Sequence, residues 1–254
     1  DVPHLREKTL KVGLVGRAAA IFRVEEIIVF PDVLGADQRE DAELIATILS
    51  YMETPQYLRK HLFKIRPELR YAGVLPPLRT PHHPLSDRIK DLTLGERREG
   101  VVVSSVKDGA LVDIGVEKPA LVPSVRIPVN ARVTVRITEL ERGPKAALVR
   151  DGEIEEYWGY RVKVSNTPLG RFLKEQPFDL TVATSRRGVP LPEVLDGLTR
   201  RWKKSQTVLV AFGAPTQGLY EITAREGINL NEVAHFVVNT IPHQGTETVR
   251  TEEA

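Results

Sequence analysis

NTIPHQGTETVRTEEA, from Asn239 to Ala254, is the stretch that decides the fold of this chain. It follows an apolar run, Ala234–Val238, that predicts a buried strand, and its Thr-rich second half predicts the start of a helix. A second strand and loop of the same kind lie upstream, Thr207–Phe212 followed by GAPTQGL at Gly213–Leu219. Two apolar strands that each end in a loop of Gly, Pro and Gln predict a small-molecule pocket at the carboxyl edge of an open α/β sheet.

The composition of the 254 residues is that of an ordinary globular protein, with 41% hydrophobic and 28% charged residues. The chain has no Cys, which excludes a disulfide framework and a thiolate metal site. No apolar run approaches the roughly 18 residues of a membrane-spanning helix, so we expect no membrane partner and a cytoplasmic location. The net charge is only +2, so binding to nucleic acid requires that the basic residues be clustered.

The first part of the chain reads as α/β structure. Apolar residues at helical spacing predict helices over His4–Phe22 and Asp41–Met52, and Val24–Phe30 between them predicts a strand. Thr54–Pro55 predicts the start of another helix, with Thr as the N-cap. The Pro-rich stretch Pro76–Leu85 then indicates a crossing between domains.

The pattern changes between Arg97 and Arg150, where five short runs with turn residues between them predict a small β-barrel of the OB type. The α/β pattern returns with strands at Arg161–Val164 and Phe178–Thr184 and a helix at Leu191–Trp202. Because helices join parallel strands, we expect the two α/β pieces to share one sheet. The predicted domains are an α/β domain in two parts, 1–76 and 160–254, with an inserted all-β domain at 77–159.

Four motifs occur in a set order along the chain: VGLVGRAAAIFRVEEIIVF at Val12–Phe30, then TSRRG, AFGAPTQGL and NTIPHQGTETVRTEEA. This series resembles the SPOUT (α/β-knot) RNA methyltransferases. The inserted barrel and the stretches YWGY and TEEA narrow the resemblance to an archaeal and eukaryotic branch regarded as RNA uridine-N3 methyltransferases. Members of this family have a strand before the first helix and a full helix after TEEA, so we expect that the termini have been trimmed.

The resemblance implies a trefoil-knotted C-terminal region, S-adenosyl-L-methionine as cofactor, a structured RNA such as ribosomal RNA as partner, and a homodimer. Knots are rare in protein folds, so this topology comes from the resemblance alone. The cofactor requires backbone groups around the adenine, an apolar slot for the ring, and close backbone approach, which Gly permits. The predicted cofactor-binding residues are Thr184, Gly213, Gly218, Leu219, Asn239, Thr240, Ile241, Gln244, Gly245, Thr246 and Val249. The alternative is that the Gly and Pro residues only turn the chain.

Arg17 on the first helix is the main catalytic candidate, because the matching Arg in many SPOUT enzymes faces the target nucleotide. A guanidinium can hold a phosphate or the uracil carbonyls in a bidentate manner and can stabilise negative charge as N3 loses its proton. The alternative is a surface Arg on an amphipathic helix. Arg250 and Glu252 are further catalytic candidates, with Glu252 as a proton acceptor, or they form an ion pair at a helix end.

OB-like folds bind single strands with basic grooves and stacking aromatic side chains. The predicted RNA-binding residues are Arg186, Arg187, Arg97, Lys107, Arg132 and Arg136, and Arg98 adds to the basic charge of the barrel. The barrel has almost no aromatic residue, so we expect contacts to phosphates or to RNA shape, and a solvated face is the alternative for each charge. His82 and His83 lack a third ligand at a recognisable spacing, so no metal site is predicted.

The predicted function is therefore transfer of a methyl group from S-adenosyl-L-methionine to RNA, at N3 of a uridine in ribosomal RNA. Two alternatives remain at this point. One is methylation of the ribose 2′-oxygen, which the motif around Arg17 also resembles. The other is a non-catalytic RNA-binding or ribosome-assembly factor on the same fold.

Overall fold

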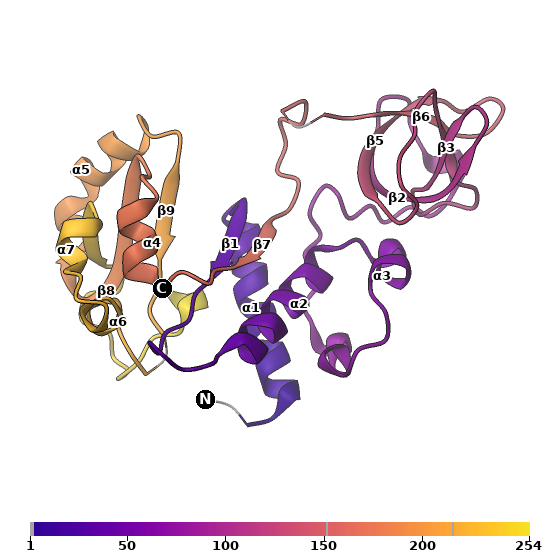
Figure 1. Ribbon diagram of the computed structural model, residues 1–254. Helices are drawn as coiled ribbons and strands as arrows, with labels where there is room; N and C mark the ends of the chain where they lie inside the picture. Colours follow the sequence, from indigo (N-terminus) through magenta and orange to yellow (C-terminus); the bar gives the residue numbers. More distant parts are fainter. Residues whose placement is uncertain (1–2, 151, 215) are drawn as a thin grey trace. The chain divides into compact units, whose positions relative to one another are not determined.

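The computed structural model describes residues 3–150, 152–214 and 216–254, so Pro215 of the GAPTQGL loop lies outside the described residues. Contacts divide the chain into two compact units, each described by itself. The sheet unit comprises Ile28–Ala46 and Lys163–Ala254, and the barrel unit comprises the residues up to Ile27 and Thr47–Val162. Figure 1 shows the elements of both units. The three predicted domains remain predictions.

The barrel unit contains the five-stranded closed barrel that the sequence predicts, with strand order β2-β3-β4-β6-β5. Neighbouring strands are antiparallel except β4 and β6, which are parallel. Alternate residues of these strands point inward, as the two-residue period of a strand requires, and Val102, Val112 and Val135 are completely buried. The strands are β2 (Arg97–Val106), β3 (Gly109–Asp113), β4 (Ala120–Pro123), β5 (Arg132–Glu139) and β6 (Lys145–Leu148).

Helices precede the barrel in the chain: α1 (Leu5–Ile21), α2 (Arg39–Glu53) and α3 (Gln56–Leu62). The predicted cap of α3 is wrong, because Pro55 occupies the N-cap position and makes no side-chain cap. Thr54 instead donates its hydroxyl to the Ser50 carbonyl oxygen at 2.8 Å. A Thr at the end of a helix can bond back to the preceding turn in this way, and α2 uses it.

The sheet unit is built on three parallel strands in the order β10-β8-β9. Leu180 and Val182 of the central strand pack on α5, whereas Ala183 faces α6 and α7, so helices cover both faces of the sheet. The strands are β8 (Leu180–Pro190), β9 (Val208–Ala211) and β10 (Phe236–Asn239), and the helices are α4 (Leu169–Glu175), α5 (Leu191–Trp202), α6 (Leu219–Arg225) and α7 (Leu230–Val233). In the described residues no helix is long and apolar enough to cross a membrane.

The two α/β pieces do share a sheet, but it is a small one and not the three-stranded sheet of the second piece. β1 (Glu26–Val29) pairs with β7 (Arg161–Val164) in a separate two-stranded sheet, and the described strands beside β8 are β9 and β10. None of the four residues of β1 is fully buried, whereas a strand inside a parallel sheet must be covered on both faces. β1 therefore fits a small sheet better than the main one.

The predicted loop Ser185–Gly188 lies inside β8, which is longer than the sequence indicates. However, the ladder to β10 jumps from Ala183 opposite Val237 to Val189 opposite Val238. Residues 184–188 therefore leave the ladder as a bulge, which re-aims their side chains. Gly188 is required there, because a Cβ would lie 2.6 Å from the carbonyl carbon of Val238. At the C-terminus, the predicted helix start is a single 3₁₀ turn, η4 (Thr251–Glu253).

Candidate functional site

The carboxyl ends of β8, β9 and β10 lie at one edge of the sheet, because the strands are parallel. The bulge 184–188 contacts the segments that follow both neighbouring strands. Asn239 donates its amide to the Arg186 carbonyl oxygen at 3.1 Å, and the Arg186 guanidinium donates to the Glu247 carbonyl oxygen at 3.2 Å. On the other side, the Thr184 hydroxyl donates to the Ala211 carbonyl oxygen at 3.1 Å. The structure thus brings both predicted loops together with the bulge.

The loop after β9 is tight. A Cβ on Gly213 would lie 2.9 Å from the Gln217 carbonyl oxygen and 3.2 Å from the Cα of Gly218, so a side chain there would displace the loop backbone. Gly218 is the N-cap residue of α6, and the Leu219 side chain that follows is completely buried in the core. Leu219 therefore anchors the end of the loop in the hydrophobic core. The sequence predicts it instead as a cofactor-binding residue.

The loop after β10 uses its polar side chains to hold its own shape. The Asn239 side chain accepts from the Ile241 N–H at 3.1 Å, and the Gln244 amide donates to the carbonyl oxygens of Thr246 and Glu247 at 2.8 and 3.1 Å. The Thr246 hydroxyl donates to the Thr248 carbonyl oxygen at 2.9 Å. Thr240, Ile241 and Val249 are half-buried.

His243 in the same loop has a φ of 61°, a left-handed conformation that costs a residue with a side chain free energy. Two residues further on, Gly245 is exposed, and a Cβ built on it would have no atom within 4 Å. In the described chain, the backbone N–H groups of His243 and Gly245 make no hydrogen bond. Open backbone donors beside the half-buried Ile241 and Val249 suit a ligand with an aromatic ring and polar edges.

Two predicted RNA contacts lie in the bulge of β8. Arg186 is exposed and holds the Glu247 carbonyl. Arg187 pairs with the Glu221 carboxylate at the start of α6, and its guanidinium lies 5.0 Å from the ring centroid of Tyr220. Arg187 therefore joins the bulge to α6 through an ion pair and a cation–π contact.

The two C-terminal candidates differ in their surroundings. Arg250 is exposed, and its backbone N–H donates to the Glu253 carboxylate at 3.0 Å. Glu252 is half-buried, and its Oε1 atom is buried without a hydrogen-bond partner among the described residues. The ion pair between Arg250 and Glu252, the structural alternative, is not formed in the described part of the chain. An unpaired buried carboxylate oxygen calls for an explanation, which a ligand can provide.

Arg17 belongs to the barrel unit, not to the unit that contains the loops. It is half-buried in α1, and its guanidinium donates to the Pro77 carbonyl oxygen at 2.6 Å. One turn earlier, Gly13 allows Leu75 to approach, because a Cβ on it would lie 2.7 Å from the Leu75 side chain. Gly13 thus lets α1 pack closely against the segment that contains Leu75 and Pro77, which accepts the Arg17 hydrogen bond.

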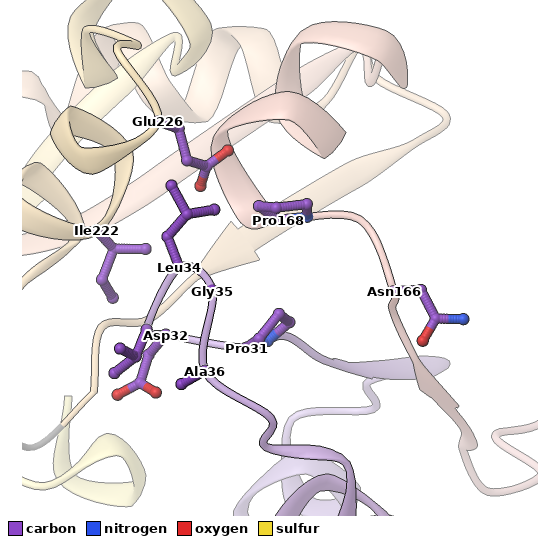
Figure 2. Close-up of a pocket in the computed structure, with 10 residues that line it drawn as sticks. Pro31, Asp32, Leu34, Gly35, Ala36, Asn166, Pro168, Ile222 and Glu226 are labelled. Carbon is purple, nitrogen blue, oxygen red and sulfur yellow. The ribbon is translucent and has the colours of Figure 1, made fainter.

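A separate pocket of about 180 Å³ lies in the sheet unit, between the segment Pro31–Ala36 and the residues Asn166, Pro168, Ile222 and Glu226 (Figure 2). The Glu226 carboxylate accepts from the N–H groups of Gly170 and Arg171 at 2.9 and 2.8 Å, so it caps α4. The predicted cofactor-binding residues do not line this pocket.

The barrel unit contains a buried charge cluster that the sequence analysis missed. Arg132 binds both oxygens of Glu53 at 2.7 and 2.9 Å and one oxygen of Glu99 at 2.6 Å. Glu53 also lies 3.1 Å from the completely buried His82 ring, and Glu99 accepts from the indole N–H of Trp158 at 2.5 Å. We call these five residues the charge cluster. The sequence contains a signal for this cluster, because the charged residue Glu53 directly follows Met52 on the apolar face of α2.

The protonation states of this region follow from burial and pairing. Burial by itself would raise the pKa of Glu53, but the hydrogen bonds from His82 and Arg132 outweigh it and lower that pKa to about 2. Burial acts against the charged form of Arg132, yet its pKa is raised because Glu53 and Glu99 stabilise the cation. Burial, assisted by His82, lowers the pKa of the neighbouring His83 to about 4. Glu53 and Arg132 are therefore ionised at neutral pH, while His83 is neutral.

The predicted RNA-binding residues of the barrel have different environments. Lys107 and Arg136 are exposed and have no ion pair in the described part of the chain. Arg97 lies 3.2 Å from the Glu156 carboxylate, and Arg132 belongs to the charge cluster. Arg98 does not contribute to a basic face, because it is 1% exposed and its guanidinium lies 2.7 Å from Glu96. Strand alternation turns Arg98 inward while Arg97 points outward.

His82 and His83 both lie within hydrogen-bond distance of the Glu53 carbonyl oxygen, at 3.0 and 2.6 Å. Across the described ranges, no group of three or more His, Cys, Asp or Glu side chains is placed to hold a metal ion. The two rings thus join the linker to the end of α2.

A parallel α/β sheet with two shaped loops at its carboxyl edge, together with an inserted five-stranded barrel, defines the class of this molecule as a mixed α/β protein. The chain matches a family model described as "Putative RNA methyltransferase" over residues 1–254. The chain belongs to this family of RNA methyltransferases, which are transferases that require a methyl donor.

Relatives extend across archaea and eukaryotes. An uncharacterized protein of Halobacterium salinarum is 37% identical over 98% of this chain and 89% of its own length. The 28S rRNA (uridine-N(3))-methyltransferase of Homo sapiens is 35% identical over 99% of this chain and 71% of its own length. The protein of the same name from Drosophila melanogaster is 35% identical over 95% of this chain and 55% of its own length.

Proposed function

We propose that this protein transfers a methyl group from S-adenosyl-L-methionine to N3 of a uridine in ribosomal RNA. The observation that carries the proposal is the meeting of the β8 bulge with the end of β9 and with the loop after β10 at one edge of the parallel sheet. The names of the human and fly relatives support the choice of uridine N3 and of ribosomal RNA.

The residues at this edge suit the proposed donor. The open space at Gly245 and the free N–H groups of His243 and Gly245 provide room and donors for adenine, while Ile241 and Val249 provide apolar surface. Bound there, S-adenosyl-L-methionine supplies a methyl group on a sulfonium, which leaves as a neutral thioether. The left-handed His243 is a strained position of the kind that clusters at ligand sites.

In the proposed reaction a bond forms between the methyl carbon and N3, and the methyl–sulfur and N3–H bonds break. The N3 proton needs an acceptor, and the unpaired Oε1 atom of Glu252 is the carboxylate oxygen that we assign to it. Arg186 lies at the rim of the same site, where its guanidinium can hold an RNA phosphate. The loops hold the two reactants together, and proximity supplies much of the rate.

We propose that Arg17 binds the uracil carbonyls and stabilises the charge that develops when N3 loses its proton. The motif order around Val12–Phe30 supports this assignment. The same resemblance supports a SPOUT-type trefoil knot in the C-terminal region and a homodimer. Light scattering of the purified protein tests the dimer, and a monomer at all concentrations would contradict it. The cytoplasmic location stays a prediction.

The first experiment incubates the protein with S-adenosyl-L-methionine that carries an isotope-labelled methyl group and with ribosomal RNA, and analyses the nucleosides by mass spectrometry. Labelled N3-methyluridine is the expected product. A label on the ribose would replace the proposed atom by the 2′-oxygen, and an unlabelled RNA would overturn the proposal. Arg17→Ala is expected to abolish the product while calorimetric donor binding persists.

A second experiment locates the donor by calorimetry. Gly245→Trp fills the open space in the loop after β10 and is expected to abolish donor binding. Gly73→Trp is the matched control, because a Cβ on Gly73 also has no atom within 4 Å and the residue lies in the barrel unit. Equal binding by both variants would place the donor elsewhere.

A further inference from the structure

The end of α5 and the residues after it contain four exposed cations within five positions: Arg200, Arg201, Lys203 and Lys204. Within the described chain none of the four forms an ion pair. The Arg201 guanidinium donates to the Asp179 backbone carbonyl oxygen at 3.0 Å, while the Asp179 carboxylate is engaged by the N–H groups of Gln206 and Thr207. In the barrel unit, by contrast, Arg97, Arg98 and Arg132 all face carboxylates.

Three of these cations line one hollow. Arg200, Arg201 and Lys204 surround an open depression of about 360 Å³ together with Gly197, which has no side chain to fill it. The spacing of three, four and seven residues from Gly197 places these positions on one side of the helical segment. The depression is shallow and open, and its three cations, which are unpaired within the described chain, raise the local concentration of counter-charge. Lys203 does not line the hollow.

We propose that this hollow binds the phosphate backbone of the RNA substrate, as an anchor at the opposite end of the sheet from the methyl-donor loops. α5 leads into β9, and the first residue of β9, Val208, pairs with Leu180 at the start of β8. The carboxyl end of α5, and with it the hollow, therefore lies at the amino ends of the strands, whereas the loops lie at their carboxyl ends. Figure 1 shows how α5 leads into β9. This inference rests on the proposed function, because it deepens the account of how the RNA is held.

Phosphate is the chemistry that the lining fits. Arg binds phosphate oxygens with a planar fork and Lys adds a point charge, so the hollow selects polyanions without reading the bases. Basic residues in the last turn of a helix also stabilise the helix dipole, which is a purely structural reason for their presence. The tests below separate these two roles.

The first test changes the hollow without removing a cation. Gly197→Glu places a carboxylate three and four residues before Arg200 and Arg201, a spacing that favours ion pairs and helix stability. Gly197→Ala is the matched control, because its Cβ would meet only the Phe236 ring at 3.9 Å. We measure affinity for a labelled RNA hairpin by fluorescence anisotropy, and thermal unfolding in parallel. Gly197→Glu is expected to weaken binding at least tenfold with no loss of thermal stability, and Gly197→Ala to bind like the parent.

The second test counts phosphate contacts. The double variant Arg200→Ala, Lys204→Ala is expected to reduce the slope of log affinity against log salt by about 1.4 to 1.8, since each lost contact removes about 0.7 to 0.9. Lys203→Ala, a cation of the same segment outside the hollow, is expected to leave the slope within about 0.3 of the parent. Equal slopes for the double variant and Lys203→Ala, or unchanged affinity of Gly197→Glu, would overturn the anchor.

The anchor and the proposed function fail in different ways. If the parent protein yields no methylated nucleoside but Gly197→Glu still weakens RNA binding, the function is wrong and the anchor stands. If the parent methylates RNA and the hollow variants bind it normally, the function stands and the anchor is wrong. With both correct, Gly197→Glu raises KM for RNA and leaves kcat unchanged at saturating RNA.

Discussion

The barrel unit and the sheet unit use charged residues in opposite ways. In the barrel unit, Glu53, Glu99 and Arg132 are turned inward and satisfy one another, with side-chain exposures of 9%, 5% and 30%. In the sheet unit, Arg186 and Arg200 are exposed and have no carboxylate partner within the described residues. Because a paired buried charge has little capacity left for a ligand, we expect Glu53, Glu99 and Arg132 to hold structure, whereas Arg186 and Arg200 are available to bind.

The largest effect is expected from breaking the charge cluster. Glu53→Ala leaves His82 without its carboxylate and Arg132 with Glu99 alone. Removing one member of a buried ionic network costs about 3–5 kcal/mol in the free energy of unfolding. Urea unfolding monitored by Trp fluorescence measures this loss. Glu156→Ala is the control, because it breaks the more exposed pair with Arg97 and should cost less than about 1 kcal/mol. Equal losses in the two variants would show that the cluster is not the structural centre of this unit.

A smaller effect is expected from the loop after β9. Gly213→Ala forces the Gln217–Gly218 backbone to move, which should cost about 1–3 kcal/mol of stability. The same change should weaken donor binding about tenfold, equivalent to about 1.4 kcal/mol. Gly245→Ala has open space at its Cβ, so its stability should stay within about 0.5 kcal/mol of the parent. Calorimetry and thermal unfolding measure both quantities, and a normal Gly213→Ala variant would contradict the tight-loop account.

The third prediction concerns how the free energy of unfolding depends on pH through His83 and Glu53 of the barrel unit. The folded-state pKa of His83, about 4, lies below its ordinary value of 6.5, so the unfolded chain takes up a proton first. The free energy of unfolding therefore falls as pH drops from 6.5 to 4, by up to about 1.4 kcal/mol per pH unit. Glu53 extends the fall from pH 4.5 towards 2, because its carboxylate must be protonated there.

The variant His83→Gln isolates the first part of this fall. It should show a flatter pH dependence between 6.5 and 4 than the parent and a similar one below 4.5. Urea unfolding at a series of pH values measures the difference. Parallel curves for parent and variant would mean that His83 titrates normally in the folded protein.

The smallest effect on stability is expected at Arg186. Its guanidinium makes one exposed hydrogen bond, to the Glu247 carbonyl at 3.2 Å, so Arg186→Ala should change the free energy of unfolding by less than about 0.5 kcal/mol. The same variant should lower methyl transfer to RNA, because the phosphate contact is lost. A variant that is destabilised by several kcal/mol would show that sheet-unit cations also serve structure, and the contrast between the units would fail.

Local patterns predict most of the secondary structure. The helix α5 is found at the predicted residues, Leu191–Trp202, and the five barrel strands are found in the predicted span. Such elements depend on the propensities of their residues and on the spacing of apolar residues, and both are set within a short segment of the chain. The long β8 is different, because its last residues pair with β10 only after a bulge. Pairing between segments about fifty residues apart is not encoded in either segment alone.

The candidate site, like the fold, was predicted only in part from the sequence. Gly, Pro and Gln at the ends of two apolar strands point to the loops at Gly213–Leu219 and Asn239–Ala254, because these residue types serve where a backbone must turn tightly. The functions of their polar side chains could not be predicted, since Asn239 and Gln244 turn out to support the backbone. The hollow on α5 was also missed, although its Arg and Lys residues are visible in the sequence.

The sequence by itself determined the class of the chain, the order of its motifs, the inserted barrel and the positions of the two loops at the carboxyl edge of the sheet, because these depend on residue types and spacings within short segments. Only the tertiary structure decided which charges are buried. Arg97 and Arg98 are adjacent and chemically identical, yet one is exposed enough to meet Glu156 while the other is 1% exposed beside Glu96. The cost of burying a charge depends on partners brought from distant parts of the chain, and folding alone assembles those partners.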